Sequence, residues 1–82
     1  MRIDKYLNAV NITKRRSIAQ DMISSGVVSI NDKIVKASKN VDIGDVITIA
    51  YLKADKKYEV LAIPTTKSTP KAEQEKYIKE VS

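Results

Sequence analysis

The sequence lacks cysteine, histidine, tryptophan and phenylalanine, and it holds only two glycines and two prolines. Without cysteine the chain forms neither a disulfide nor a thiolate nucleophile. Without histidine it lacks the commonest general base of enzymes and the commonest protein ligand of metals. Serine, lysine and aspartate could still build a catalytic site, but such sites are rare on this inventory. We therefore expect no enzyme, no metal site and no cofactor.

Long apolar runs are also missing. No segment approaches the ~20 apolar residues that span a bilayer, and charges at Arg2, Asp4 and Lys5 interrupt the region where a signal peptide would be apolar. We therefore expect a cytoplasmic protein without a membrane partner. The length of 82 residues predicts one small domain, and the net charge of +5 favours a polyanion such as nucleic acid as partner.

Apolar periodicity predicts two helices at the start of the chain. In the first ten residues the apolar positions at helical spacing are Ile3, Tyr6, Leu7 and Val10. Arg2 and Lys5 fall on one flank of this stripe, and Asp4 falls on the other, where it suits the positive end of the helix dipole. We expect a second helix over residues 14–25, with Thr13 as its N-cap and Gly26 closing it in the left-handed conformation.

β-Branched runs predict antiparallel strands after Gly26, over residues 27–30, 33–35, 46–51 and 58–63. Turns are expected at Asn31-Asp32 and Gly44-Asp45. The predicted fold class is α+β: two N-terminal helices packed on a small, mostly antiparallel, curved sheet. A domain over residues 1–63 is followed by a linker and tail over 64–82 that is flexible or weakly helical. The residues expected to be largely buried are Ile3, Leu7, Val10, Ile18, Met22, Ile23, Val28, Ile30, Ile47 and Ile49.

Basic residues gather at the starts of both predicted helices. Lys14, Arg15 and Arg16 are consecutive at the start of the second, where each opposes the helix dipole at a cost of some tenths of a kcal/mol. Three cations at a helix start, where the helix dipole disfavours positive charge, indicate a functional role. The role that such a group of cations suits best is binding a phosphate backbone. Arg2 and Lys5 supply further cations for the same role.

Each candidate also has a structural interpretation. Arg2 can form a surface ion pair with Asp4 or Asp45, and the lysines of the hairpin region can serve solubility alone. Those lysines are Lys33, Lys36 and Lys39. Tyr51 and Tyr58 either stack on a base or pair across strands. Tyr6 is expected in the core.

The order of these anchors resembles the RNA-binding domain named after ribosomal small-subunit protein four, also called the alpha-L RNA-binding motif. The anchors are Arg2-Ile3-Asp4-Lys5-Tyr6-Leu7, then Arg16-Ser17 with Ala19, Gly26 with Val28, Ile30 and Asn31, and Gly44-Asp45 with Ile47. The resemblance covers about residues 1–52. Two positions depart from the family: the usual Asn-Gly turn is Asn31-Asp32, and Arg15 replaces a small residue. In that family two helices and a small curved sheet make an RNA-binding face.

Two groups of short stand-alone members are similar in length: the RqcP (YabO) family of ribosome-associated quality control, and the heat-shock S-four proteins that bind free large subunits. The resemblance implies binding to rRNA and tRNA on the large ribosomal subunit, with Arg2 and Arg16 matching the RNA-contacting arginines of the family. We favour the first group, which implies stabilisation of stalled peptidyl-tRNA and a tailing factor as a further partner. We also expect a monomer off the ribosome. The candidate RNA-binding residues are Arg2, Lys5, Lys14, Arg15, Arg16, Lys33 and Lys36.

Other functions are compatible with the same basic residues. A heat-shock-type protein would recycle free large subunits with nascent chains. A basic protein–protein adaptor would dock on an acidic partner, and its binding would survive RNase. An RNA-binding segment of a modifying enzyme is disfavoured, because the residues after the matched region are too few for a catalytic domain.

Overall fold

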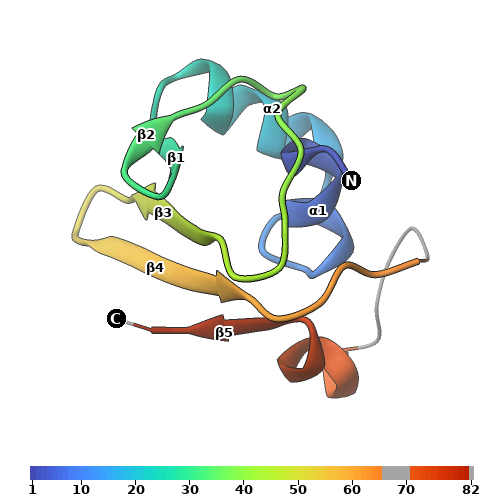
Figure 1. Cartoon of the computed structure of the whole chain (residues 1–82). Helices are drawn as coiled ribbons and strands as arrows, with labels where there is room; N and C mark the ends of the chain where they lie inside the picture. The colour runs from blue at the N-terminus through green and yellow to red at the C-terminus, as the bar shows by residue number, and fades with distance from the viewer. Residues whose placement is uncertain (66–70, 82) are drawn as a thin grey trace.

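The protein is described by a computed structural model that covers residues 1–65 and 71–81 (Figure 1). Two helices, five strands and a short 3-10 helix follow one another along these ranges. They are α1 (Ile3–Ala9), α2 (Arg16–Ser24), β1 (Val28–Ile30), β2 (Lys33–Ile34), β3 (Val46–Ala50), β4 (Asp55–Val60), the 3-10 helix η1 (Lys71–Lys76) and β5 (Ile78–Glu80).

The strands form one sheet in the order β2-β1-β3-β4-β5, and every neighbouring pair is antiparallel. Figure 1 shows the sheet curving from β2 to β5, with α1 and α2 on one side of it. The predicted α+β class and the antiparallel sheet are therefore confirmed. Helix α1 packs against α2, which also contacts β1, and the buried side chains of α1 share the core with those of β1 and β3.

The β1–β2 hairpin has a two-residue loop, because Ile30 pairs with Lys33. Both loop residues have positive φ, 51° at Asn31 and 68° at Asp32, which is the combination that a type I′ turn requires. The Asn31 side chain also accepts a hydrogen bond from the Val46 backbone N–H at 3.1 Å. Asn31-Asp32 thus makes the predicted tight turn although the second residue is not glycine.

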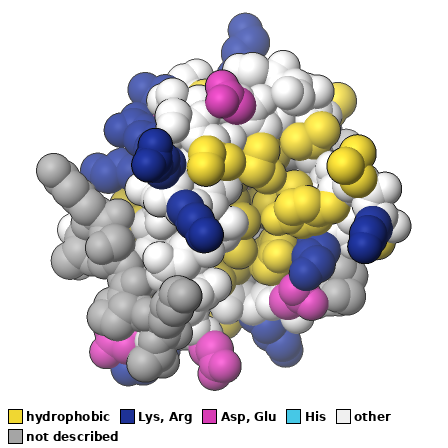
Figure 2. Space-filling view, turned by 180° about the vertical axis from the view of Figure 1, so that it is seen from behind, with side chains coloured by type: hydrophobic (Ala, Val, Ile, Leu, Met, Phe, Trp, Pro, Cys, Tyr) yellow, Lys and Arg dark blue, Asp and Glu magenta, His cyan; other side chains and the backbone are white. Residues whose placement is uncertain are grey.

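The core combines the buried face of α1 with the inner face of the sheet. Ile3, Tyr6, Leu7 and Val10 are fully buried with Ile47 and Ile49 of β3. Of the residues predicted to be buried, Met22 is only partly buried and Ile18 is 42% exposed, so the prediction for Ile18 is wrong. The reason is the rotation of α2, which turns Ala19 and Ile23 toward the core. Ile18 instead lines an open apolar groove with Met22, Val27 and Leu52. Figure 2 shows apolar side chains exposed on the back of the molecule, with Lys and Arg side chains around them.

The starts of both helices differ from the prediction. Arg2 is extended (φ −65°, ψ 147°) and forms a β-bridge with Asn40 instead of the first helical turn. Helix α2 begins at Arg16, two residues later than predicted, and Arg15 occupies the N-cap position without a side-chain cap. Thr13 is not the N-cap, because its hydroxyl donates to the Arg15 carbonyl at 3.1 Å while its own N–H bonds to the Leu7 carbonyl.

The C-terminal region holds a strand that the sequence did not predict. Strand β4 begins at Asp55, earlier than expected, and β5 pairs with it through the register Val60 to Ile78. Residues 71–76 form the short 3-10 helix, which agrees with a weakly helical segment. The predicted linker falls largely on residues 66–70, outside the described residues. The flexibility of the tail and the domain boundary after residue 63 stay predictions.

Tertiary contacts fasten β5 to the rest of the fold. The Tyr6 hydroxyl of α1 donates to the Tyr77 carbonyl at 2.8 Å, and Ile78 is buried.

Within residues 1–65 and 71–81, none of the helices has the length and hydropathy that a membrane-crossing helix needs.

Candidate nucleic-acid interface

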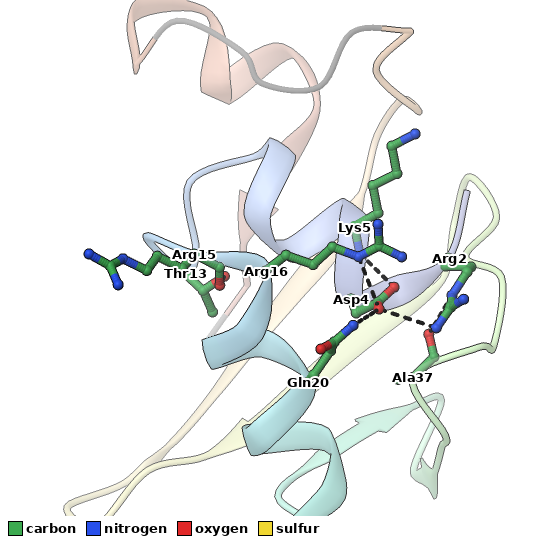
Figure 3. A network of polar contacts seen from close by, with 8 residues as sticks. All are labelled: Arg2, Asp4, Lys5, Thr13, Arg15, Arg16, Gln20 and Ala37. Carbon is green, nitrogen blue, oxygen red and sulfur yellow. Dashed lines mark hydrogen bonds and ion pairs between the residues drawn. The ribbon is translucent and has the colours of Figure 1, made fainter.

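A fully buried carboxylate, that of Asp4, lies between the two helices. Its Oδ2 atom accepts hydrogen bonds from Arg2 Nη2 at 3.3 Å, from Arg16 Nε at 3.2 Å and from Gln20 Nε2 at 3.0 Å (Figure 3). Its Oδ1 atom accepts from the Lys5 backbone N–H at 2.8 Å. We call Arg2, Asp4, Arg16 and Gln20 the Asp4 cluster. A buried charge with this many donors is well compensated.

Each member of the Asp4 cluster is placed by its element. Asp4 lies in the first turn of α1, on the side that faces α2. Arg16 and Gln20 are one turn apart on α2, so their side chains share a face and reach the same carboxylate. Arg2 precedes α1 in an extended conformation, which lets its side chain turn toward Asp4. The predicted placement of Arg2 and Asp4 on opposite flanks is therefore wrong, because Arg2 lies outside the helix.

Opposing effects set the ionisation of Asp4. Burial alone would raise the pKa of the Asp4 carboxyl, but hydrogen bonds from Gln20, Arg16 and the Lys5 backbone, with the positive charge of Arg16, more than offset it. The pKa of Asp4 therefore lies below its ordinary value. At neutral pH the carboxylate is charged and holds both arginines.

The two arginines keep donors for a ligand. Their side chains are about half exposed, 47% for Arg2 and 44% for Arg16, while Asp4 is 0% exposed. Arg16 uses only Nε toward Asp4, so among the described residues both of its terminal nitrogens are without a protein acceptor. Arg2 donates from Nη2 to Asp4 and from Nε to the Ala37 carbonyl, the latter at 3.4 Å. The arrangement presents guanidinium groups that are tethered on one side and open on the other.

A second basic region borders Arg2 through the loop after β2. The Ile3 N–H donates to the Lys39 carbonyl at 2.7 Å, and the Val41 N–H donates to the Met1 carbonyl at 2.9 Å. These bonds fasten the loop to the start of α1. Lys36 and Lys39 of this loop and Lys33 of β2 line an open groove of about 590 Å³, which we call the lysine groove. Asp42 and Asp45 also line this groove and reduce its positive charge.

The structure thus separates the predicted site residues into groups. Arg2 and Arg16 meet at one carboxylate, and Lys5 adjoins them through its backbone, with its side chain extending away from Asp4 (Figure 3). Arg15 points away from Asp4, although it neighbours Arg16 in the chain. Lys14 is exposed in the bend before α2. Lys33 and Lys36 line the lysine groove, which adjoins the Asp4 cluster through the bond from Arg2 Nε to the Ala37 carbonyl.

Sequence reasoning did not assign a site role to Gln20 or Asp4. The four-residue spacing of Arg16 and Gln20 is a signal that both side chains lie on one helix face. No such signal exists for Asp4, because its approach to Arg16 depends on how two helices pack. Lys39 also joins the groove, where the sequence left its role open.

The tyrosines divide between core and surface. Tyr58 is 9% exposed and Tyr51 is 41% exposed. Burial, with the charge and hydrogen bond of Tyr51 and the charge of Glu80, raises the pKa of Tyr58 to about 12. Tyr58 is thus a core residue whose ring is not free to stack on a base. Among the described residues, no group of three or more acidic side chains is arranged to hold a metal ion.

Known proteins resemble this chain over most of its length. A family model described as the S4 domain matches residues 1–47. A protein of Helicobacter pylori named RQC P-site tRNA stabilizing factor is 46% identical over 78 residues, which cover 95% of this chain and 93% of the relative.

Two solved structures share the whole fold. The solution structure of a protein described as hypothetical is similar with a TM-score of 0.87 and 43% identity, and the match covers 100% of this chain and 98% of that one. The trimeric structure of Vibrio cholerae Heat Shock Protein 15 has a TM-score of 0.89 and 30% identity, covering 100% of this chain and 82% of that one. The chain therefore belongs to the S4 domain family, in the group of the RQC P-site tRNA stabilizing factors.

Proposed function

We propose that this protein binds rRNA and tRNA on the large ribosomal subunit and stabilises stalled peptidyl-tRNA in ribosome-associated quality control. The observation that carries the proposal is the pair of half-exposed arginines, Arg2 and Arg16, fixed on a buried carboxylate of an S4 domain. The Helicobacter pylori relative is named for stabilising a P-site tRNA, which supports the same role here.

The mechanism is binding without bond chemistry. A guanidinium grips a phosphate through two parallel charge-assisted hydrogen bonds, and the terminal nitrogens of Arg16 are available for that geometry. The added contacts hold the tRNA in one position on the large subunit in the cytoplasm. The protein is not an enzyme in this proposal, and it needs no cofactor.

The other basic candidates extend the contact. Lys5, Lys14 and Arg15 would meet phosphates around the Asp4 cluster, and Lys33 and Lys36 would meet a second stretch of backbone at the lysine groove. Because these side chains are exposed and have no ion pair with any described residue, they would contribute mainly long-range attraction.

A heat-shock-type role on free large subunits is the second candidate, because the fold also matches that of Vibrio cholerae Heat Shock Protein 15. The two roles differ in the state of the subunit. The quality-control role requires tighter binding when peptidyl-tRNA occupies the subunit and tailing is under way. The heat-shock role requires tight binding to released subunits that carry nascent chains without a tailing factor.

Binding to purified large subunits tests the proposal. Subunits with and without peptidyl-tRNA are titrated at several salt concentrations, and each phosphate contact should add about −0.7 to −0.9 to the slope of log affinity against log salt. We expect a slope that corresponds to roughly three to five contacts, and tighter binding with peptidyl-tRNA. A flat salt dependence, or binding that survives RNase, would favour the adaptor function.

A matched pair of variants tests the residues. Arg16→Ala should weaken binding about tenfold, which corresponds to one charge-assisted interaction. Arg15→Ala removes the same kind of side chain one position earlier, outside the Asp4 cluster, and should weaken binding about twofold to threefold. Equal losses in folded variants would mean that bulk charge governs binding. Circular dichroism separates loss of fold from loss of contact.

A further inference from the structure

We propose that Asp4 is a positioning residue for RNA binding: its buried carboxylate fixes Arg2 and Arg16 so that both guanidinium groups meet the same stretch of phosphate backbone. This inference rests on the proposed function and assigns a role to a residue that does not itself touch RNA. The juxtaposition that carries it is the single oxygen, Asp4 Oδ2, on which both arginines and Gln20 converge.

The sign of the charge makes Asp4 informative. A negative charge inside a phosphate-binding surface repels the ligand, so simple electrostatics predicts that removing it strengthens binding. Burying a carboxylate between two helices also requires several donors to compensate its lost hydration. Asp4 is fully buried and is supplied with four of them. Any benefit of Asp4 for RNA binding therefore comes from what it does to the arginines.

The benefit is order before binding. A long side chain that is free in solution loses conformational freedom when a ligand immobilises it, and this loss lowers affinity. Arg2 is fixed at two atoms, by Asp4 and by the Ala37 carbonyl, and Arg16 is fixed at Nε. The terminal nitrogens of Arg16 stay available for a phosphate. Two guanidinium groups tied to one oxygen are also held near each other against their mutual repulsion.

Gln20 completes the arrangement as a neutral donor. Its amide N–H bonds to the same Oδ2 at 3.0 Å and comes from the same helix face as Arg16. It fixes the orientation of the carboxylate without adding a charge. Gln20 is exposed at the surface, so its replacement by alanine changes neither the core nor the net charge.

Asp4→Asn gives a test in which the two explanations predict opposite signs. The substitution keeps the shape of the side chain and removes one negative charge. We expect binding to large subunits with peptidyl-tRNA to weaken about threefold to tenfold. The matched control is Asp21→Asn, which removes the same charge from an exposed position of α2 and should leave affinity unchanged or up to twofold tighter.

A double-mutant cycle separates positioning from a purely structural role. In the Arg2→Gln/Arg16→Gln background there are no guanidinium groups for Asp4 to orient, so Asp4→Asn should change affinity less than twofold. A residue that only supported the fold would have the same effect in both backgrounds. Gln20→Ala, with Ser17→Ala as its neutral control, should weaken binding about twofold to threefold, and it decides the case if Asp4→Asn does not fold.

The outcomes distinguish this inference from the proposed function. Folded Asp4→Asn that binds as tightly as the unmodified protein, or more tightly, overturns the positioning role and leaves the proposed function intact. An equal effect of Asp4→Asn in both backgrounds overturns it as well. The proposed function itself is overturned if the unmodified protein does not bind large subunits, or if the arginine double variant binds them as tightly as the unmodified protein.

Discussion

The Asp4 cluster and the lysine groove are both basic, but they hold their charges differently. In the cluster, Arg2 and Arg16 each contact one fully buried carboxylate. In the groove, Lys33, Lys36 and Lys39 are exposed, and within the described ranges none of them forms an ion pair. One region is ordered before a ligand arrives, and the other must be ordered by the ligand.

This difference shows why a count of charges does not rank binding residues. Lysine and arginine attract a polyanion from a distance about equally, because that attraction depends on charge and salt. At contact they differ, because the arginine fork makes two hydrogen bonds and the lysine ammonium is a flexible point charge. The tethers at Asp4 increase that difference. We therefore expect the cluster to set affinity and the groove to set mainly the salt-dependent attraction.

The difference between the two regions is tested most directly by removing two positive charges from each. Arg2→Gln/Arg16→Gln should weaken binding to large subunits about 30- to 100-fold, and Lys33→Gln/Lys36→Gln about threefold to fivefold, since charge-assisted hydrogen bonds at ordered sites contribute more than exposed charges. Glutamine is used because its amide can still donate toward Asp4. Titration of labelled protein into large subunits measures both affinities.

The control for this pair is the salt dependence. Both double variants should lower the slope of log affinity against log salt by a similar amount, about 0.7 to 0.9 for each lost phosphate contact. Similar slopes with a lower affinity for the arginine double variant would support the stronger role of the Asp4 cluster. Equal affinities of the two double variants would contradict it and would mean that net charge governs binding.

Much of the fold followed from local patterns. The stripe of Ile3, Leu7 and Val10 predicted α1, and the positive φ of Gly26, 76°, agrees with a glycine that closes α2. These features depend on neighbours in the chain, so periodicity and turn chemistry are enough to find them. The match of an S4 domain to residues 1–47 covers the same region.

Features that depend on distant partners were not predictable in the same way. Strand β5 has three residues and forms because β4 offers an edge, which no local pattern of residues 78–80 reveals. The site shows the same limit. The sequence predicts Arg2 and Arg16 as separate cations, but their meeting at Asp4 depends on the packing of α1 against α2. Whether the chosen residues bind RNA stays a prediction that the variants above address.

Acid should affect the two regions differently, because only the cluster contains a buried carboxyl. With its pKa lowered in the folded protein, Asp4 stabilises the fold above the ordinary carboxyl pKa, about 3.9, and this stabilisation is lost as pH falls through the lowered value. At pH 7 we expect Asp4→Asn to lower the free energy of unfolding by about 1–2 kcal/mol. This value lies in the lower part of the range for hydrogen bonds to charged groups, because the two arginines are half exposed and water screens their charges.

Urea unfolding from pH 7 to pH 2 measures this effect. The gap in unfolding free energy between Asp4→Asn and the unmodified protein should close as pH falls, since both then lack the charge. The Lys33→Gln/Lys36→Gln variant should stay close to the unmodified protein throughout. A gap that is constant with pH would mean that the cost of Asp4→Asn is one of shape rather than of charge.

Tyr6→Phe tests a contact that belongs to neither basic region. The Tyr6 hydroxyl donates to the Tyr77 carbonyl and so connects α1 to the residues before β5. That carbonyl also accepts from the N–H groups of Leu61 and Ala62, so it keeps partners when the hydroxyl is removed. We expect a loss of about 0.5–1 kcal/mol in the free energy of unfolding. Affinity for large subunits should not change, and a loss of more than threefold would show that β5 takes part in binding.

The smallest effect concerns the hairpin that carries Lys33. Asp32 has a φ of 68°, a conformation that glycine adopts at less cost than aspartate, and the type I′ turn favours Asn-Gly. Asp32→Gly should therefore raise the free energy of unfolding by about 0.5 kcal/mol, measured by urea unfolding. Asp32→Asn removes the same charge but keeps the β-carbon, so the difference in unfolding free energy between the two variants isolates the effect of backbone conformation.

If the lysine groove acts through charge alone, both variants should tighten binding to the same extent, less than twofold and only at low salt. A clear gain for Asp32→Gly over Asp32→Asn would show instead that the geometry of the hairpin matters, and the contrast between an ordered cluster and an unordered groove would have to be withdrawn.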